Sequence, residues 1–429
     1  MQAINSGDTA FILISAALVM FMTPGLALFY GGMVRSKNVL STLMHSFIAL
    51  GVVSVLWVLC GYTLAFGPDK WHIIGSLKYI GLQGISQSPI KDYAPTIPGY
   101  AFVVYQGMFA VITPALISGA FAERIKFKAY MIFITLWSLL VYAPIAHWVW
   151  GVDGWIRNLG ALDFAGGTVV HISSGIAALV TALIIGKRKG FLQESFHPHN
   201  ITMTLIGTAI LWFGWFGFNA GSALSSGGLT SLAFMTTNLG AAAASLSWLT
   251  LEWLKDGKPT MLGAASGAVA GLVGITPGAG FVSPLAAIII GLTVGIVCYF
   301  AISVKFKLGY DDSLDVVGVH FAGGTLGALA TGIFASKALN PNGADGLLYG
   351  NPSLLGTQAL AIVVTIAFSA AMTFVIFKVI DLAVGVRADL EDEQAGLDLS
   401  QHGEIGMYFD GQTERLLSPA KIDPAVVKN

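Results

Sequence analysis

Charged side chains are scarce in this chain. Of its 429 residues, 10 % are Asp, Glu, Lys or Arg and 55 % are hydrophobic, whereas about a quarter of the residues in soluble globular proteins are charged. The formal net charge is −1 and no basic face is present, which argues against a nucleic-acid partner. The composition predicts a multi-pass protein of the cell (inner or plasma) membrane, surrounded by lipid.

Cysteines and catalytic motifs are also few. Cys60 and Cys298 lie inside apolar runs, so neither a disulfide framework nor a metal site is expected. His197 and His199 lack partners at the spacing of metal ligands, and no G-x-S-x-G, H-E-x-x-H or phosphate-binding loop occurs. We therefore expect no metal, no cofactor and no enzymatic activity.

Long apolar runs, by contrast, recur along the whole chain. They predict an all-α membrane protein with eleven transmembrane helices, the eighth of them short, because about 20 apolar residues cross the hydrocarbon of a bilayer. The runs cover residues 9–33, 41–66, 99–121, 129–150, 164–186, 200–220, 229–253, 261–275, 281–303, 314–336 and 355–380. Residues 1–380 would form the transmembrane domain. Residues 381–429 would form a polar tail, either a flexible terminus or a contact for a soluble partner.

Lys and Arg are distributed unequally between the loops. The loops after runs 1, 3, 5, 7 and 9 hold twelve of them, and the opposite loops hold five. The positive-inside rule then places the N-terminus outside and the tail in the cytoplasm. Runs 1–5 begin outside and runs 6–10 begin inside, so the two halves, if related, form a 5+5 inverted pseudo-repeat of the kind common in transporters.

Two runs share an unusual arrangement of ionisable residues. His171 follows Asp163 by eight residues in one run, and His320 follows Asp315 by five in the other. In inverted halves the two histidines would approach the membrane midplane from opposite sides and face one another. A lone membrane histidine is more often an interhelical hydrogen-bond partner, but two at matching positions favour a functional pair. Glycines spaced by four, Gly263 to Gly271 and Gly323 to Gly327, predict close helix contact nearby.

Several motifs carry a resemblance to a known family. They are PGLALFYGGMVRSKNVLS (24–41), FAERIKF (121–127), PIAHWVWG (144–151), DFAGGTVVHI (163–172), GWFGFNAGSA (214–223) and DDSLDVVGVH (311–320). In order and spacing the chain resembles the ammonium transporter family (Amt/Mep, distantly related to Rh proteins) over essentially its whole length. The resemblance implies eleven helices per subunit, a conduction path through each protomer and a homotrimer. It also implies a trimeric PII-type signal protein as cytoplasmic partner.

The resemblance also assigns roles to aromatic residues. Phe109, Trp150 and Ser222 would recruit ammonium outside, with the cation over the aromatic faces. Phe109 and Phe218 would form a stacked phenyl gate below this site, with Trp215 nearby in the wall of the outer opening. Tyr105 stands where the best-known members carry phenylalanine, so a more polar vestibule is expected.

The acids permit more than one interpretation. Asp163 could attract cations, receive a proton from ammonium, or cap its helix through N–H groups near Gly166 and Thr168, and we favour capping. Asp315 is interpreted in the same way. Asp311 and Asp312 are expected to anchor the cytoplasmic mouth and the tail.

Transport is the function that these residues predict. A bare cation in an apolar pore is prohibitively costly, so ammonium would lose its proton and cross as ammonia past His171 and His320, with or without a separate proton relay. The alternatives are an ammonium sensor that signals through its tail, and a channel for water or urea, which would not need an aromatic cation site.

Overall fold

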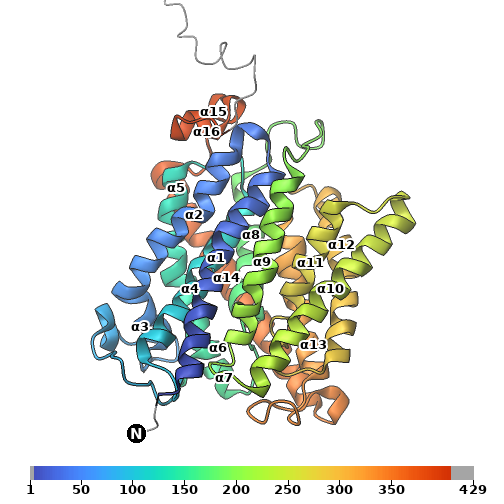
Figure 1. Cartoon of the computed structure of the whole chain (residues 1–429). Coiled ribbons are helices and arrows are strands. Elements are labelled where there is room, and N and C mark those ends of the chain that lie inside the picture. The colour runs from blue at the N-terminus through green and yellow to red at the C-terminus, as the bar shows by residue number, and fades with distance from the viewer. Residues whose placement is uncertain (1–3, 407–429) are drawn as a thin grey trace, which may run out of the picture.

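The computed structural model describes residues 4–406, and its helices form one bundle (Figure 1). The long helices are α1 (Ser6–Met33), α2 (Val39–Leu56), α4 (Gly99–Ile117), α5 (Phe127–Trp137), α6 (Ala143–Trp150), α8 (Ser173–Ile185), α9 (Ile201–Gly221), α10 (Gly228–Asp256), α11 (Met261–Ile275), α12 (Pro284–Leu308), α13 (Ala322–Phe334) and α14 (Pro352–Val384). Short elements join them: η1 (Ser36–Asn38), α3 (Tyr62–Phe66), η3 (Leu77–Leu82), η4 (Ser118–Ala120), α7 (Trp155–Asn158) and η8 (Leu347–Tyr349).

Helices stand at all eleven positions that the apolar runs predict. In residues 4–406, nine helical segments are long and apolar enough to cross a membrane. The other two are α11, which is short as predicted, and α10, which is long but carries more polar residues. Helix starts follow ordinary capping chemistry, since Asn200 caps α9 and Ser283 caps α12 just before Pro284.

Four of the predicted helices contain a π-helical turn. These turns are η2 (Trp57–Gly61), η5 (Ser138–Tyr142), η6 (Gly167–Ile172) and η7 (Val317–Phe321). A π-turn inserts one residue into the helix and rotates the side chains that follow, and such turns are frequent at functional sites. The turns η6 and η7 contain His171 and His320.

Glycines let the helices approach closely, as their spacing predicted. A Cβ at Gly271 would collide with the carbonyl oxygen of Gly240, and one at Gly327 with that of Gly274. These contacts join α11 to α10 and α13 to α11. In a bilayer the surrounding lipid is as apolar as the helix surfaces, so the hydrophobic effect does not drive helices together, and close backbone contact of this kind holds them instead.

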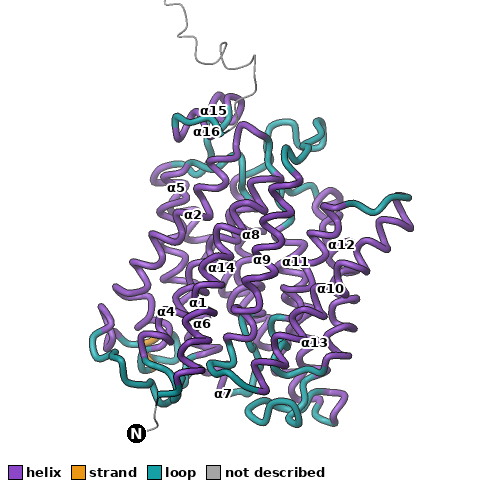
Figure 2. The backbone as a smooth tube through the Cα atoms, viewed as in Figure 1, coloured by secondary structure: helices purple, strands orange, loops and turns teal. Residues whose placement is uncertain are grey.

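The bundle has two distinct faces. The N-terminal face carries the strand pair β1 (Asp69–Lys70) and β2 (Ile74–Gly75), shown in orange in Figure 2, together with α7. The tail face, at the opposite end, carries α15 (Leu390–Ala395) and α16 (Leu397–His402) (Figure 1). The predicted boundary between the transmembrane domain and the tail, at residue 380, falls inside α14, because this helix continues to Val384.

The first part of the tail is attached to the bundle. Asp398 accepts hydrogen bonds from the backbone N–H groups of Leu40 and Ser41, at 3.0 and 2.8 Å. Glu393 is buried, accepts from the N–H of Lys189 and pairs with Arg387 at 2.7 Å. Residues 385–406 are thus held against α2 and its neighbours, and residues 407–429 of the predicted tail lie outside the described residues.

Candidate functional site

His171 and His320 meet inside the bundle, as the sequence predicted. Their Nδ1 atoms are 3.2 Å apart and their rings stack with centroids 5.3 Å apart. Both side chains are buried, with 1 % and 4 % of their surface exposed. The shared hydrogen bond requires one Nδ1 to donate and the other to accept, so at least one ring is neutral. Nε2 of His171 has no hydrogen-bond partner among residues 4–406 and remains available to a small molecule.

Three cavities follow one another through the bundle. A vestibule of about 470 Å³ on the N-terminal face is lined by Phe109, Trp150, Asp163 and Ser222 among others. A histidine cavity of about 10 Å³ is lined by His171 and His320, and an inner cavity of about 30 Å³ lies beyond and shares His320 as lining. The two small cavities hold about one and two water-sized molecules. No hydrated ion fits them.

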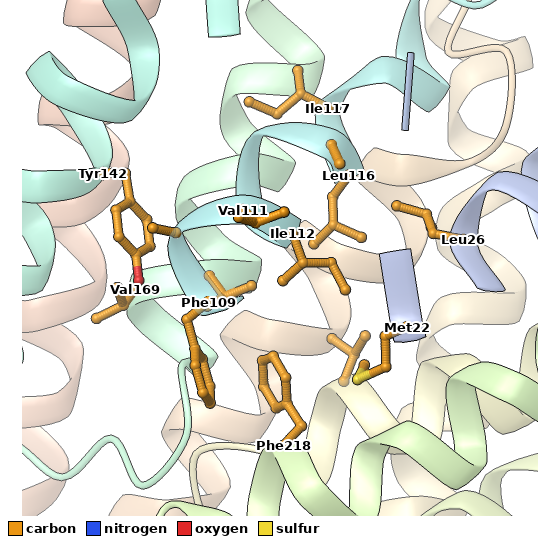
Figure 3. Close-up of a cluster of buried hydrophobic side chains, with 14 of the residues drawn as sticks. Met22, Leu26, Phe109, Val111, Ile112, Leu116, Ile117, Tyr142, Val169 and Phe218 are labelled. Carbon is orange, nitrogen blue, oxygen red and sulfur yellow. The ribbon is translucent and has the colours of Figure 1, made fainter. Parts of the chain in front are cut away.

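Two phenyl rings separate the vestibule from the histidine cavity. Phe109 lines the vestibule, Phe218 lines the histidine cavity, and their ring centroids are 4.3 Å apart. Figure 3 shows the two rings side by side below the buried side chains of Ile112 and Leu116. A molecule passing between these cavities must displace this pair, which we call the phenyl gate.

The vestibule offers aromatic faces and oxygen atoms at its base. Trp150 meets Phe109 edge to face, with centroids 5.7 Å apart, and its Nε1 donates to the carbonyl of Asp163 at 3.0 Å. The hydroxyl of Ser222 donates to the carbonyl of Phe218 at 2.9 Å, which leaves lone pairs on Ser222 for another donor. A small cation with N–H groups matches this combination of rings and acceptors.

Asp163 holds the start of the helix that carries His171. Its Oδ1 accepts from the N–H groups of Gly166 and Gly167, both at 2.7 Å, and its Oδ2 from those of Thr168 and Val169, at 2.8 and 3.1 Å. Four backbone donors are thereby satisfied by one carboxylate. The capping contacts expected near Gly166 and Thr168 are present.

The chain matches a known family along most of its length. Residues 10–407 match the sequence model of the Ammonium Transporter Family. The chain belongs to the ammonium transporter family. It is 56 % identical to the ammonium transporter of Bacillus subtilis over 93 % of this chain and 98 % of that one, and 48 % identical to Amt1 of Archaeoglobus fulgidus over 94 % and 99 %.

Solved structures agree with this assignment. The crystal structure of Candida albicans Mep2 has a TM-score of 0.86 and 35 % identity, covering 99 % of this chain and 94 % of that one. A "Sensor Amt Protein" has a TM-score of 0.84 and 28 % identity, covering 92 % and 98 %. Family membership confirms the predicted multi-pass membrane protein and excludes an enzyme.

Three residues of the predicted site stand elsewhere than expected. Tyr105 is fully buried behind the wall of the vestibule and does not line it; its hydroxyl contacts the carbonyls of Gly217 and Phe218 and the Ser222 hydroxyl, at 3.0, 2.8 and 3.2 Å. Tyr105 therefore lies one layer behind the vestibule surface, and its contact with Ser222 joins it to that surface. Trp215 lines the histidine cavity instead of the outer opening, because it stacks on His171 with centroids 5.5 Å apart.

The third is Asp315, for which we expected a cap like that of Asp163. Asp315 has a left-handed backbone, with φ of 61°, and its carboxylate pairs with Lys305 at 2.5 Å. Asp312 makes the cap instead, accepting from the N–H of Val317 at 2.8 Å. Asp311, in turn, binds Arg188 through both oxygens, at 2.8 to 2.9 Å, on the tail face.

One positioning residue was missed in the sequence. The buried amide of Gln358 accepts from the N–H of Leu162 at 2.7 Å and donates to its carbonyl at 2.8 Å and to that of Ala328 at 3.1 Å. Gln358 thus holds the residue before Asp163. A single amide within the apolar run 355–380 was the available signal, since a polar group in such a run needs partners.

Proposed function

We propose that the chain recruits ammonium in the vestibule and conducts it as ammonia past His171 and His320. The sequence of cavities carries this proposal: a vestibule with cation-binding character, a closed phenyl gate, and a narrow apolar path in which Nε2 of His171 has no hydrogen-bond partner among residues 4–406. Cation–π attraction in the vestibule contributes about 0.5 to 2 kcal/mol to the binding of ammonium. A bare cation has nothing to replace its hydration further in, so only the neutral form crosses.

In this proposal the N-terminal face is outside and the tail face is cytoplasmic. The excess of Lys and Arg in the loops of the tail face supports this orientation, with eleven membrane crossings. The matching construction of η6 and η7, each with a histidine and an aspartate cap at its start, supports a 5+5 inverted pseudo-repeat. The homotrimer and the PII-type partner rest on the family resemblance.

Ammonium gives up its proton before the phenyl gate. In the proposal Asp163 braces the site and is not the main proton acceptor, because both of its oxygens are occupied by backbone N–H groups. The histidine pair then offers a donor or an acceptor to ammonia. The released proton either stays outside, which gives a gas channel, or follows through the imidazoles, which gives electrogenic transport.

Current recordings on proteoliposomes test this proposal. If the released proton follows through the imidazoles, wild type should give a saturating ammonium current that methylammonium blocks. If the proton stays outside, wild type should give ammonia flux without current. His171→Ala and His320→Ala should each abolish the current, while His197→Ala, at an exposed histidine of the tail-face loop, should leave it unchanged. An unchanged current in both pore variants would reject the relay.

An ammonium sensor is the second candidate. The docking of Glu393 and Asp398 onto the bundle supports it, because a change in the pore could reach the tail through α2 and α14. A similar solved structure is that of a "Sensor Amt Protein". A ligand-induced change in the tail without any ammonium flux would favour this function over transport.

A further inference from the structure

His147 occupies an unusual electrostatic position in α6. Its Nδ1 lies 3.0 Å from the carbonyl oxygen of Ala65, and its Nε2 lies 3.0 Å from Oδ1 of Asp69. The residue is buried, with 1 % of its surface exposed. A carbonyl can only accept a hydrogen bond, and so can an ionised carboxylate. Both contacts are made together only when both ring nitrogens carry a proton, so this geometry holds an imidazolium.

Asp69 is itself kept in its ionised form. Its Oδ2 accepts from the backbone N–H of His72 at 3.1 Å, and the His72 ring lies 3.3 Å away. Partial burial acts to raise the pKa of Asp69. The hydrogen bonds from His147 and His72 together lower it by more than burial raises it, so the pKa of Asp69 lies below the ordinary value. The charges on both partners are therefore matched.

Other titratable groups nearby have other contacts. The elements packed against α6 contribute Tyr62 (α3), Tyr142 (η5), Arg157 (α7) and His171 (η6), and β1 also carries Lys70. Arg157 donates to the carbonyl of Trp150 at 2.8 Å. Within the described part of the chain, no hydrogen bond or ion pair joins His147 to any of these five groups. The protonation of His147 is thus coupled first to Asp69.

The contact joins the strand pair to the helix that ends in Trp150. Asp69 belongs to β1, and a second contact follows from Trp148, whose Nε1 donates to the carbonyl of Ile73 at 2.7 Å. Trp150 stands one helical turn after His147 and is the last residue of α6. We propose that His147 and Asp69 form a pH-sensitive latch, which holds the β1–β2 strand pair on α6 and positions Trp150 for ammonium. The second half of this statement rests on the proposed function.

The latch closes only in a window of pH. When His147 loses a proton, one ring nitrogen presents a lone pair to an oxygen, and that contact breaks. At the acid end, a carboxylate with a lowered pKa contributes stability above its ordinary pKa of about 3.9, and this is lost as pH falls through the lowered value. The strand pair should therefore loosen at both extremes of external pH.

Hydrogen exchange of residues 67–78 tests the latch directly. In wild type, protection of these amides, corrected for the intrinsic rate, should fall about tenfold or more from about pH 6 to about pH 9, the factor that a charge-assisted hydrogen bond supplies. Asp69→Asn can donate to a neutral imidazole and should show equal protection at both values. His72→Asn, which removes the exposed imidazole 3.3 Å from Asp69, and Asp92→Asn, at an exposed carboxylate of the same loop, should both keep the wild-type dependence on pH. Loss of that dependence in His72→Asn would assign it to His72 and overturn the latch. Equal protection in wild type, or an Asp69→Asn variant that follows wild type, would overturn the latch.

Transport kinetics test the positioning of Trp150. The KM for the ammonium ion, corrected for its fraction at each pH, should rise with external pH in wild type and stay flat in Asp69→Asn. A pH-dependent strand pair with a flat wild-type KM would overturn the positioning role. Hydrogen exchange needs no transport, so its outcome is separate from the flux on which the proposed function depends.

Discussion

Replacing Asp163 with Asn separates a brace from a proton acceptor. The carboxylate satisfies four backbone N–H groups, those of residues 166 to 169. An asparagine at this position keeps one oxygen and places an NH₂ group against the other two donors. Two buried N–H groups then lose their acceptor, at about 1 to 3 kcal/mol each. The start of η6 should be destabilised by about 2 to 6 kcal/mol.

Hydrogen exchange in detergent micelles measures this cost. Amides 166 to 169 of Asp163→Asn should exchange about 30-fold faster or more, which corresponds to the lower bound of about 2 kcal/mol. Asp153→Asn, at an exposed carboxylate of the preceding turn, is the matched control and should exchange as wild type does. If Asp163→Asn lost ammonium flux while amides 166 to 169 kept wild-type protection, Asp163 would act as a proton acceptor and the bracing role would be refuted.

Three further predictions concern other parts of the path. Tyr105→Phe removes a buried hydroxyl with three contacts, so the KM for ammonium in flux assays should rise about two- to tenfold without loss of fold. Asp312→Asn should lower the melting temperature by more than Asp315→Asn does, because only Asp312 caps η7. Burial acts to raise the pKa of Glu123, but Arg188 and Arg35 hold it below the ordinary value. The contribution of ionised Glu123 to the stability of the fold is therefore fully present above about pH 4.3 and is lost as pH falls through the lowered pKa. The melting temperature should fall over the same range of pH.

Much of the fold was readable from hydrophobicity alone. Each apolar run of about 20 residues has a helix at its position, because every backbone group in a bilayer must be satisfied within its own segment. The meeting of His171 and His320 was also readable, because two ionisable groups at matching depth have few alternatives to facing each other. These predictions depend on the composition and length of each run, which are independent of how the helix is rotated about its axis.

Predictions of which way a side chain faces from its helix were less successful. Tyr105 and Trp215 were expected around the outer opening, yet one lies behind its wall and the other beside His171. Those two expectations came from the family resemblance, and both residues lie on helices without a π-turn, α4 and α9. A separate difficulty lies in four other helices, where the π-helical turns η2, η5, η6 and η7 interrupt the regular repeat of 3.6 residues and no simple sequence pattern marks them. After each such turn a side chain faces a direction that a regular helix would not predict.

The exchange of roles between Asp312 and Asp315 follows from where η6 and η7 begin in the structure. Asp163 precedes the start of η6 at Gly167 by four residues, and Asp312 precedes the start of η7 at Val317 by five. Asp315 precedes it by two, which is too close for a short side chain to reach N–H groups that point back along the axis. The distance to the first helical turn selects Asp312, but the structure is needed to locate that turn, and the distance to the histidine selected Asp315 instead. The left-handed turn at Asp315 then directs its carboxylate to Lys305, on the inner side of the histidine cavity.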